Sequence, residues 1–183
     1  MSAADLRFPP GFFLRDALSV APDLLGCALV RRFPDGRVVS GVIAETEAYL
    51  CDDPACHAHR GPTPRNAAMF LAGGHAYVYF IYGIHFCVNV VTGPAGRGEA
   101  VLLRTLRIDG FPPAGLPVAR TDGPGRLCRA LGIDRALDGA DLTDPTGPLF
   151  LLPRSGPAPV FTTTPRIGIR QNAEVPWRFV VKP

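Results

Sequence analysis

The sequence predicts an α+β fold: one domain with a curved, mostly antiparallel, open-barrel-like β-sheet, a few short helices and a protruding aromatic β-hairpin. Three observations predict it. Alternating, β-branched segments outnumber helical ones. Most of them follow one another directly along the chain, which favours antiparallel pairing. The chain has 183 residues, enough for one sizeable core but too few for two ordinary domains, so residues 1–183 are expected to form a single domain.

The first elements lie before residue 50. Residues 12–20 and 23–25 predict short helical turns, with Pro22 starting the second because proline fits the first turn of a helix. Residues 28–33 and 37–49 alternate between apolar and polar side chains. A Pro-Asp-Gly turn separates these two segments, so they predict a β-hairpin.

The middle of the chain holds the aromatic hairpin. Residues 66–71 predict a short helix closed by a Gly-Gly pair. Residues 77–81 and 85–91, rich in tyrosine and valine, predict the two strands of the hairpin, and residues 100–106 predict a further strand.

The last third returns to short strands. Residues 125–131 predict a short helix that Gly132 stops. Further strands are expected at residues 149–152, 160–163, 166–169 and 177–181. Tracts rich in proline and glycine at residues 60–64, 110–117 and 152–159 are too short to link separate domains.

The composition indicates a globular protein that is neither secreted nor embedded in a membrane. The most apolar run, residues 76–91, is interrupted by Gly83, His85 and Asn89, and the N-terminus lacks the basic start and apolar stretch of a signal peptide. We therefore expect a cytoplasmic, nucleoid-associated protein in a bacterium or a nuclear one in a eukaryote. In either compartment its five cysteines are expected to be reduced.

The net charge of +3 is small, but its distribution is uneven. Residues 54–108 and 151–183 each carry a net charge of +4, whereas the other two segments are acidic. If the basic segments meet in the fold, they form a positive face suited to phosphates. Codon bias is the alternative explanation, because 18 of the 19 basic residues are arginine.

Two carboxylates and an aromatic residue share one face of a predicted strand. Period-two alternation places Glu45, Glu47 and Tyr49 together. A carboxylate in a partly dry pocket can act as a general base for water. A solvated edge face is the alternative.

Cysteine, aspartate and histidine crowd into residues 51–59. Their spacing does not fit a structural zinc site, but His57, His59 and Asp53 are a candidate set for a catalytic metal. A hydrogen-bonded active-site histidine explains the same residues without a metal.

The aromatic hairpin and the scarcity of lysine narrow the chemistry. Tyr82 lies beside the hairpin turn, where it either forms a wedge between DNA base steps or folds back onto the sheet. Asn89, among valines, either reads a base edge or is a hydrogen-bonded core amide. The only lysine is Lys182, which disfavours Schiff-base and phosphate-loop mechanisms and favours an activated water.

Several ordered strings at matching spacings resemble the alkyladenine (3-methyladenine) DNA glycosylase family, from about Leu24 to the C-terminus. They are Glu45-Thr46-Glu47-Ala48-Tyr49, His57, Thr63-Pro64-Arg65-Asn66, Met69-Phe70, Tyr77-Val-Tyr-Phe-Ile-Tyr-Gly83, Phe86-Cys87-Val88-Asn89 and Val101-Leu-Leu-Arg104. The resemblance implies a base-excision-repair hydrolase with a single domain and without metal or cofactor. It implies that Glu47 is the general base for the attacking water, and that Arg104 and the carbonyl of Ile167 help to hold that water.

The resemblance also implies how the substrate is bound. Tyr49 and His57 match the pair that sandwiches the flipped base, Tyr79 is a further wall, and Asn89 excludes the 2-amino group of guanine. Tyr82 matches the side chain that fills the gap in the base stack.

The expected DNA contacts beside Tyr82 are Thr63, Arg65 and Gly83. The expected partner is duplex DNA containing damaged purines, bound by a monomer. Cys51 replaces a usual glycine, the loop before His57 is one residue shorter than in mammalian relatives, and the hairpin continues with Ile84-His85. These departures bear on the substrate range, especially on neutral lesions such as hypoxanthine. A non-catalytic module that binds damaged DNA is the main alternative, and a metal-dependent hydrolase is the second.

Overall fold

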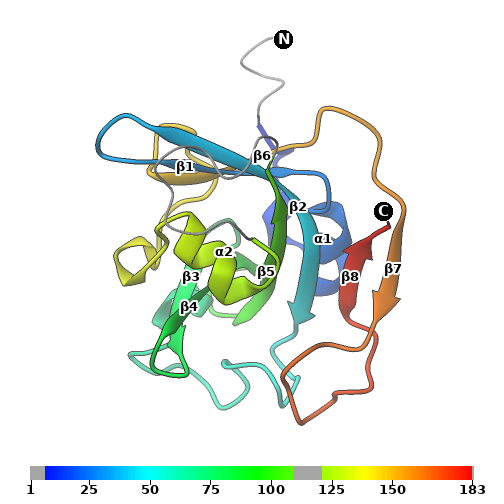
Figure 1. The fold of residues 1–183 in the computed structure, drawn as a ribbon. Helices are drawn as coiled ribbons and strands as arrows, with labels where there is room; N and C mark the ends of the chain where they lie inside the picture. Colours follow the sequence, from blue (N-terminus) through cyan, green and yellow to red (C-terminus); the bar gives the residue numbers. More distant parts are fainter. Residues whose placement is uncertain (1–6, 109–120, 183) are drawn as a thin grey trace.

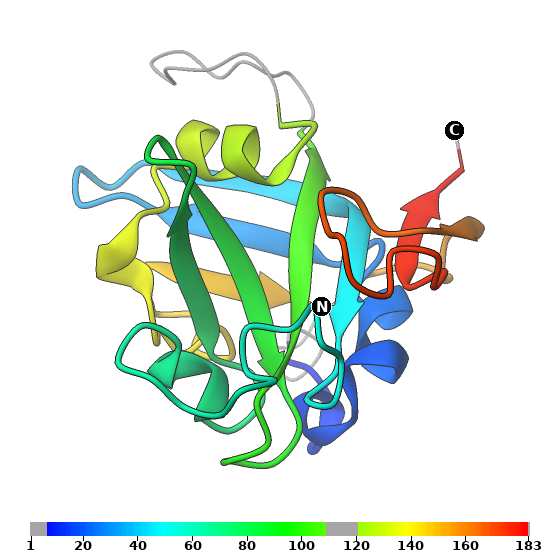
Figure 2. The same cartoon turned by 90° about the horizontal axis from the view of Figure 1, so that it is seen from below.

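The frame of the protein is an eight-stranded antiparallel sheet, seen in a computed structural model that describes residues 7–108 and 121–182 (Figure 1). The strands are β1 (Ala28–Arg32), β2 (Val38–Tyr49), β3 (Ala76–Ile81), β4 (His85–Thr92), β5 (Glu99–Arg107), β6 (Leu149–Leu152), β7 (Phe161–Thr164) and β8 (Arg178–Val181). Their order is β3-β4-β5-β2-β1-β6, and β8 joins β2 to β7. The sheet curls into a half-barrel (Figure 2), which confirms the predicted α+β class and curved antiparallel sheet.

Strand β2 is the branch point of the sheet. One of its edges pairs with β5 along most of its length. Its other edge pairs first with β1, over Val38–Val42, and then with β8, over Glu45–Glu47. The C-terminal end of β2 therefore lies between β5 and β8.

The pairing of β2 with β5 is irregular where β2 changes partner. The register shifts between Ile43 and Glu45 and again between Glu45 and Thr46. Glu45 lies opposite Thr105 and Thr46 opposite Leu103, so Arg104 falls between the two pairs. A bulge of this kind redirects side chains, and it turns Arg104 towards the carboxylates of β2.

Among the residues that the structure describes, two short α-helices accompany the sheet: α1 (Ala17–Asp23) and α2 (Pro124–Ala130). Single 3-10 turns lie at Phe12–Leu14, Ala67–Phe70 and Arg135–Leu137. The prediction that Pro22 starts a helix was wrong: the side chain of Asp16 accepts a hydrogen bond from the Ser19 N–H and starts α1, and Pro22 lies in the last turn.

Both predicted hairpins are confirmed, but residues 166–169 do not form the expected strand. They run as an irregular segment beside β2, held by side-chain contacts rather than by a ladder. The proline- and glycine-rich tract at residues 110–117 lies outside the described residues.

Side chains from both helices and from the sheet share the main core. A smaller cluster packs residues 56–69 against β3, β4 and β5. It consists of Cys56, Ala58, Ala68, Met69, Tyr77, Val91 and Ala100, and it fixes the loop that carries His57. Within residues 7–108 and 121–182, every helix is too short or too polar to cross a membrane.

Candidate active site

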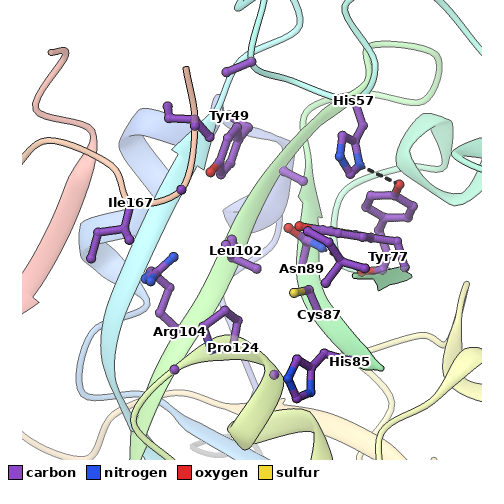
Figure 3. Close-up of a pocket in the computed structure, with 18 of the residues that line it drawn as sticks. Tyr49, His57, Tyr77, His85, Cys87, Asn89, Leu102, Arg104, Pro124 and Ile167 are labelled. Carbon is purple, nitrogen blue, oxygen red and sulfur yellow. Dashed lines mark hydrogen bonds between the residues drawn. The ribbon is translucent and has the colours of Figure 1, made fainter. Parts of the chain in front are cut away.

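A cavity of about 540 Å³ opens between the end of β2, the β3–β4 hairpin, the start of α2 and residues 167–169 (Figure 3). Its aromatic lining consists of Tyr49, His57, Tyr77, Tyr79, Tyr82 and His85. Cys87, Asn89, Leu102 and Arg104 line it from β4 and β5. The two basic segments of the sequence meet here, because both contribute to the lining.

The strand register explains why distant residues converge. Tyr77 lies opposite Asn89, Asn89 opposite Leu102, and Leu102 opposite Glu47. Residues directly opposite one another in an antiparallel sheet point to the same face. One row across β3, β4, β5 and β2 therefore carries the aromatic wall at one end and the carboxylate at the other.

The Glu47 carboxylate is wholly buried, and both of its oxygens have partners. Its Oε1 accepts a hydrogen bond from the Ile167 N–H at 2.8 Å and lies 3.2 Å from Nη1 of Arg104. Its Oε2 accepts a hydrogen bond from the Tyr49 hydroxyl at 2.9 Å. A buried charge needs such partners, and these three hold the carboxylate in one orientation behind the cavity lining.

A second carboxylate, Glu45, holds the arginine. Its Oε1 lies 2.9 Å from Nε of Arg104 and 2.6 Å from Nε of Arg178, and its Oε2 accepts the Thr105 hydroxyl. Burial alone would raise the pKa of Glu45, but the bonds from Thr105 and Arg178 and the charge of Arg104 leave it below its usual value. The expectation that Glu45 and Glu47 share a face is confirmed, since Arg104 contacts both.

Aromatic rings form two facing walls. Tyr49 stands on one side of the cavity and His57 on the other (Figure 3). The rings of His57 and Tyr79 have centroids 4.5 Å apart at 70°, and Tyr77 lies 5.4 Å from Tyr79. The space between the walls is suited to a flat aromatic guest.

The imidazole of His57 is hydrogen-bonded within the wall, and its surroundings favour the uncharged form. Its Nδ1 lies 2.9 Å from the Tyr77 hydroxyl. Burial, together with the charge of Arg65, lowers the pKa of His57, so the imidazole is neutral at neutral pH. Burial and the neighbouring Glu47 raise the pKa of Tyr49, which keeps that hydroxyl protonated and able to donate.

Asn89 is buried between the two walls. Its side-chain nitrogen donates to the Tyr77 carbonyl at 2.9 Å. This bond fixes the amide in the cavity lining, so Asn89 is both a hydrogen-bonded core amide and a group that a guest would meet.

The four expected DNA contacts lie on the hairpin and on the loop beside it. Tyr82 is 77% exposed, so it does not fold back onto the sheet. It has a φ of 54° and Gly83 one of 70°, and the Ile84 N–H closes the turn on the Ile81 carbonyl. An exposed aromatic residue in the left-handed region is strained, which is characteristic of functional positions.

Thr63 and Arg65 occupy the loop. Arg65 donates to the Phe80 carbonyl at 3.1 Å and so ties the loop to β3. Thr63 bonds Asn66, whose side chain also donates to the His57 carbonyl. Neither Thr63 nor Arg65 lines the cavity; both are exposed beside it.

The candidate metal ligands are not brought together. Asp53 is buried against Arg166, with which it forms an ion pair, and it accepts a hydrogen bond from Asn172. Among residues 7–108 and 121–182, no cluster of three histidine, cysteine or acidic side chains is placed to hold a metal.

The cavity also contains residues that sequence reasoning missed. Tyr77 could have been found from its period-two relation to Tyr79. Pro124 and Gly125 of α2 also line the cavity, whereas the buried Arg166 lies behind its lining, against the ring of Tyr49. These positions arise from packing between segments distant in sequence.

Similarity to known proteins agrees with this geometry. A family model described as methylpurine-DNA glycosylase (MPG) matches residues 11–183. A protein of Carboxydothermus hydrogenoformans, provisionally named a 3-methyladenine DNA glycosylase, is 45% identical over 97% of this chain and 96% of its own length. Proteins with the same provisional name from Methanoculleus marisnigri and Herpetosiphon aurantiacus are 45% and 46% identical, over 97% and 93% of this chain and 96% and 83% of their own lengths.

The class of protein follows from these matches together with the cavity and its buried carboxylate: a DNA-repair enzyme that hydrolyses N-glycosyl bonds. Within that class, the chain belongs to the methylpurine-DNA glycosylase family.

Proposed function

We propose that this protein binds duplex DNA as a monomer, extrudes an alkylated purine into the cavity and hydrolyses its bond to deoxyribose, leaving an abasic site. The observation that carries the proposal is the Glu47 carboxylate, oriented by Tyr49, Arg104 and Ile167 next to an aromatic cavity. The relatives named above carry provisional names that refer to 3-methyladenine.

The hairpin and the aromatic walls suit base extrusion. Unstacking a base costs a few kcal/mol, and the exposed Tyr82 is placed to fill the space that the base leaves. A purine alkylated at N3 or N7 is cationic and stacks favourably on electron-rich rings such as Tyr49 and Tyr79. A neutral His57 avoids repelling that cation.

The chemistry needs one water. In the proposed step, the C1′–N bond breaks and its electron pair leaves with the purine, which neutralises the purine's positive charge. The water oxygen bonds to C1′, and Glu47 takes the released proton. Oε2, which accepts the Tyr49 hydroxyl, has lone-pair capacity left for this proton. The negative carboxylate also stabilises the oxocarbenium-like transition state.

Selection against normal guanine is assigned to Asn89. Its amide is fixed in the cavity lining, so the 2-amino group of guanine would collide with a side chain that cannot turn away. Deaminated purines such as hypoxanthine lack that amino group, and we include them as candidate substrates. Because they are neutral, the leaving base must take up a proton from solvent water as the C1′–N bond breaks.

The test is single-turnover excision from duplex oligonucleotides that carry an alkylated adenine or hypoxanthine, with alkali used to cut at abasic sites. We expect strand cleavage only after alkali, and no product from Glu47→Gln. Glu174→Gln, which changes an exposed glutamate, is the matched control and should retain full activity.

Other outcomes identify the alternatives. Binding of lesion DNA without abasic product from any lesion would leave a damage-recognition module as the function. Loss of excision in a chelator would indicate a metal-dependent hydrolase, whereas the proposed mechanism predicts unchanged activity.

A further inference from the structure

Arg166 is a buried cation directly behind one wall of the cavity. Its guanidinium carbon lies 4.7 Å from the ring centroid of Tyr49 and 5.0 Å from that of Trp177. Its side chain is wholly buried and forms an ion pair with Asp53, which is equally buried. Tyr49 lines the cavity and Arg166 does not, so the ring separates the cation from the guest space.

The same residue anchors the segment that contacts the catalytic carboxylate. Arg166 donates to the Ala48 carbonyl at 3.0 Å, on the strand that carries Glu47 and Tyr49. The next residue, Ile167, donates its N–H to Glu47 at 2.8 Å. Asn172 closes the segment by donating to Asp53 at 3.1 Å.

Stability alone does not account for this pair. Burying two charges costs several kcal/mol, and apolar residues of similar volume are often as stable in their place. Nε of Arg166 is also buried without a hydrogen-bond partner among the described residues, which adds to that cost. The arrangement instead constrains two groups that act on the substrate.

We propose that Arg166, paired with Asp53, is a positioning residue for excision: it braces Tyr49 as the base-stacking wall and holds the Ile167 N–H on Glu47. Base stacking and water activation then share one anchor. This inference rests on the proposed glycosylase function and deepens it. Arg166 touches neither the guest nor the water.

The inference predicts a selective kinetic defect. Misplacing catalytic groups by about 1 Å costs about 100-fold in rate. The exposed hairpin and loop that we expect to contact DNA lie away from Arg166, so DNA binding should change little. Arg166→Met is therefore expected to lower the maximal single-turnover rate constant about 100-fold and to change the half-saturating enzyme concentration less than about threefold. Arg166→Lys, which keeps the charge but loses the planar fork, should recover part of the rate.

The experiment compares wild type, Arg166→Met, Arg166→Lys and Asp53→Asn, with Lys182→Met as an exposed cation-to-methionine control. Urea unfolding, followed by the fluorescence of the only tryptophan, Trp177, shows which variants are folded. If Arg166→Met does not fold, the same split between rate and half-saturation is read from Arg166→Lys and Asp53→Asn.

The outcomes separate the two proposals. Absence of excision by wild type would overturn the proposed function itself. Excision by wild type, together with wild-type maximal rates in the folded Arg166 and Asp53 variants, would overturn only the positioning role. If the variants raised only the half-saturating enzyme concentration and kept the wild-type maximal rate, the positioning role would also be overturned.

Discussion

Glu47 illustrates how a carboxylate beside a cavity can be oriented without being exposed. Its two oxygens are held by groups from three places: Arg104 on β5, Tyr49 two residues away on β2, and the backbone of Ile167. All three of these residues also line the cavity. A guest that contacts these residues can therefore change the surroundings of the Glu47 carboxylate without contacting the carboxylate itself.

The Tyr49 hydroxyl can be separated from the Tyr49 ring. Tyr49→Phe keeps the stacking wall but removes the bond to Oε2 of Glu47. A hydrogen bond to a charged group contributes about 1.5–3 kcal/mol, so we expect a maximal excision rate about 10- to 100-fold lower with half-saturation unchanged.

Tyr77→Phe is the comparison for this prediction. It removes another buried tyrosine hydroxyl, one that bonds His57 and not Glu47. Tyr77→Phe should raise the half-saturating enzyme concentration more than it lowers the maximal excision rate, because it disturbs the wall that binds the base. Equal effects of the two substitutions on both parameters would contradict a specific role for the Tyr49 hydroxyl.

At the scale of elements, the β3–β4 hairpin stores strain at its tip. Tyr82 has a left-handed backbone and 77% exposure, so its ring contributes little packing to offset the cost. Asparagine adopts this conformation more easily than tyrosine. Tyr82→Asn should therefore raise the free energy of unfolding in urea by about 1 kcal/mol and lower excision from duplex DNA.

Ile84→Asn tests whether the gain in stability expected for Tyr82→Asn comes from relief of backbone strain. Ile84 is 71% exposed on the same turn but is not among the residues with positive φ. The Ile84→Asn substitution should therefore not raise the free energy of unfolding. A loss of stability in Tyr82→Asn would instead mean that the ring packs on the protein.

Sequence patterns predicted the elements whose signals are local. Alternation and a Pro-Asp-Gly turn were sufficient for the β1–β2 hairpin, and tyrosine-valine alternation for β3 and β4. The bulge that places Arg104 was not predictable, because it depends on the register between β2 and β5. A strand was predicted at residues 166–169, but Arg166 there is fixed by an ion pair and not by a ladder of backbone hydrogen bonds.

For the whole molecule, burial of His57 links the site to global stability. Its pKa is lowered in the folded protein by burial and by Arg65, while the unfolded value is about 6.5. The unfolded chain therefore binds more protons below that pH, and the stability contributed by neutral His57 is lost as pH falls below about 6.5.

His57→Gln should reduce this pH dependence. The difference in unfolding free energy between pH 7.5 and lower pH, measured in urea, should be smaller in the variant. The contribution cannot exceed about 1.4 kcal/mol per pH unit. An unchanged pH dependence in His57→Gln would assign the titration to other groups.

The resemblance to a known family predicted which residues gather at the cavity, but the patterns themselves did not. Glu47, His57, Tyr79 and Ile167 lie on separate segments, and only the curled sheet brings them together. The charge pattern left open whether residues 54–108 and 151–183 meet, and the structure shows that they do so around the cavity. The pairing of Asp53 with Arg166 left no trace in composition or periodicity.

The pairing of β8 with β2 has a consequence for folding during synthesis of the chain on the ribosome. Arg178 reaches Glu45 across 133 residues of chain. At about 5–20 residues per second, a ribosome needs roughly ten seconds to supply that strand after it has made Glu45. Until then, the edge of β2 beside Glu47 lacks the strand that pairs with it in the folded protein. A chain truncated before residue 178 would lack both that strand and one of the two arginines that hold Glu45.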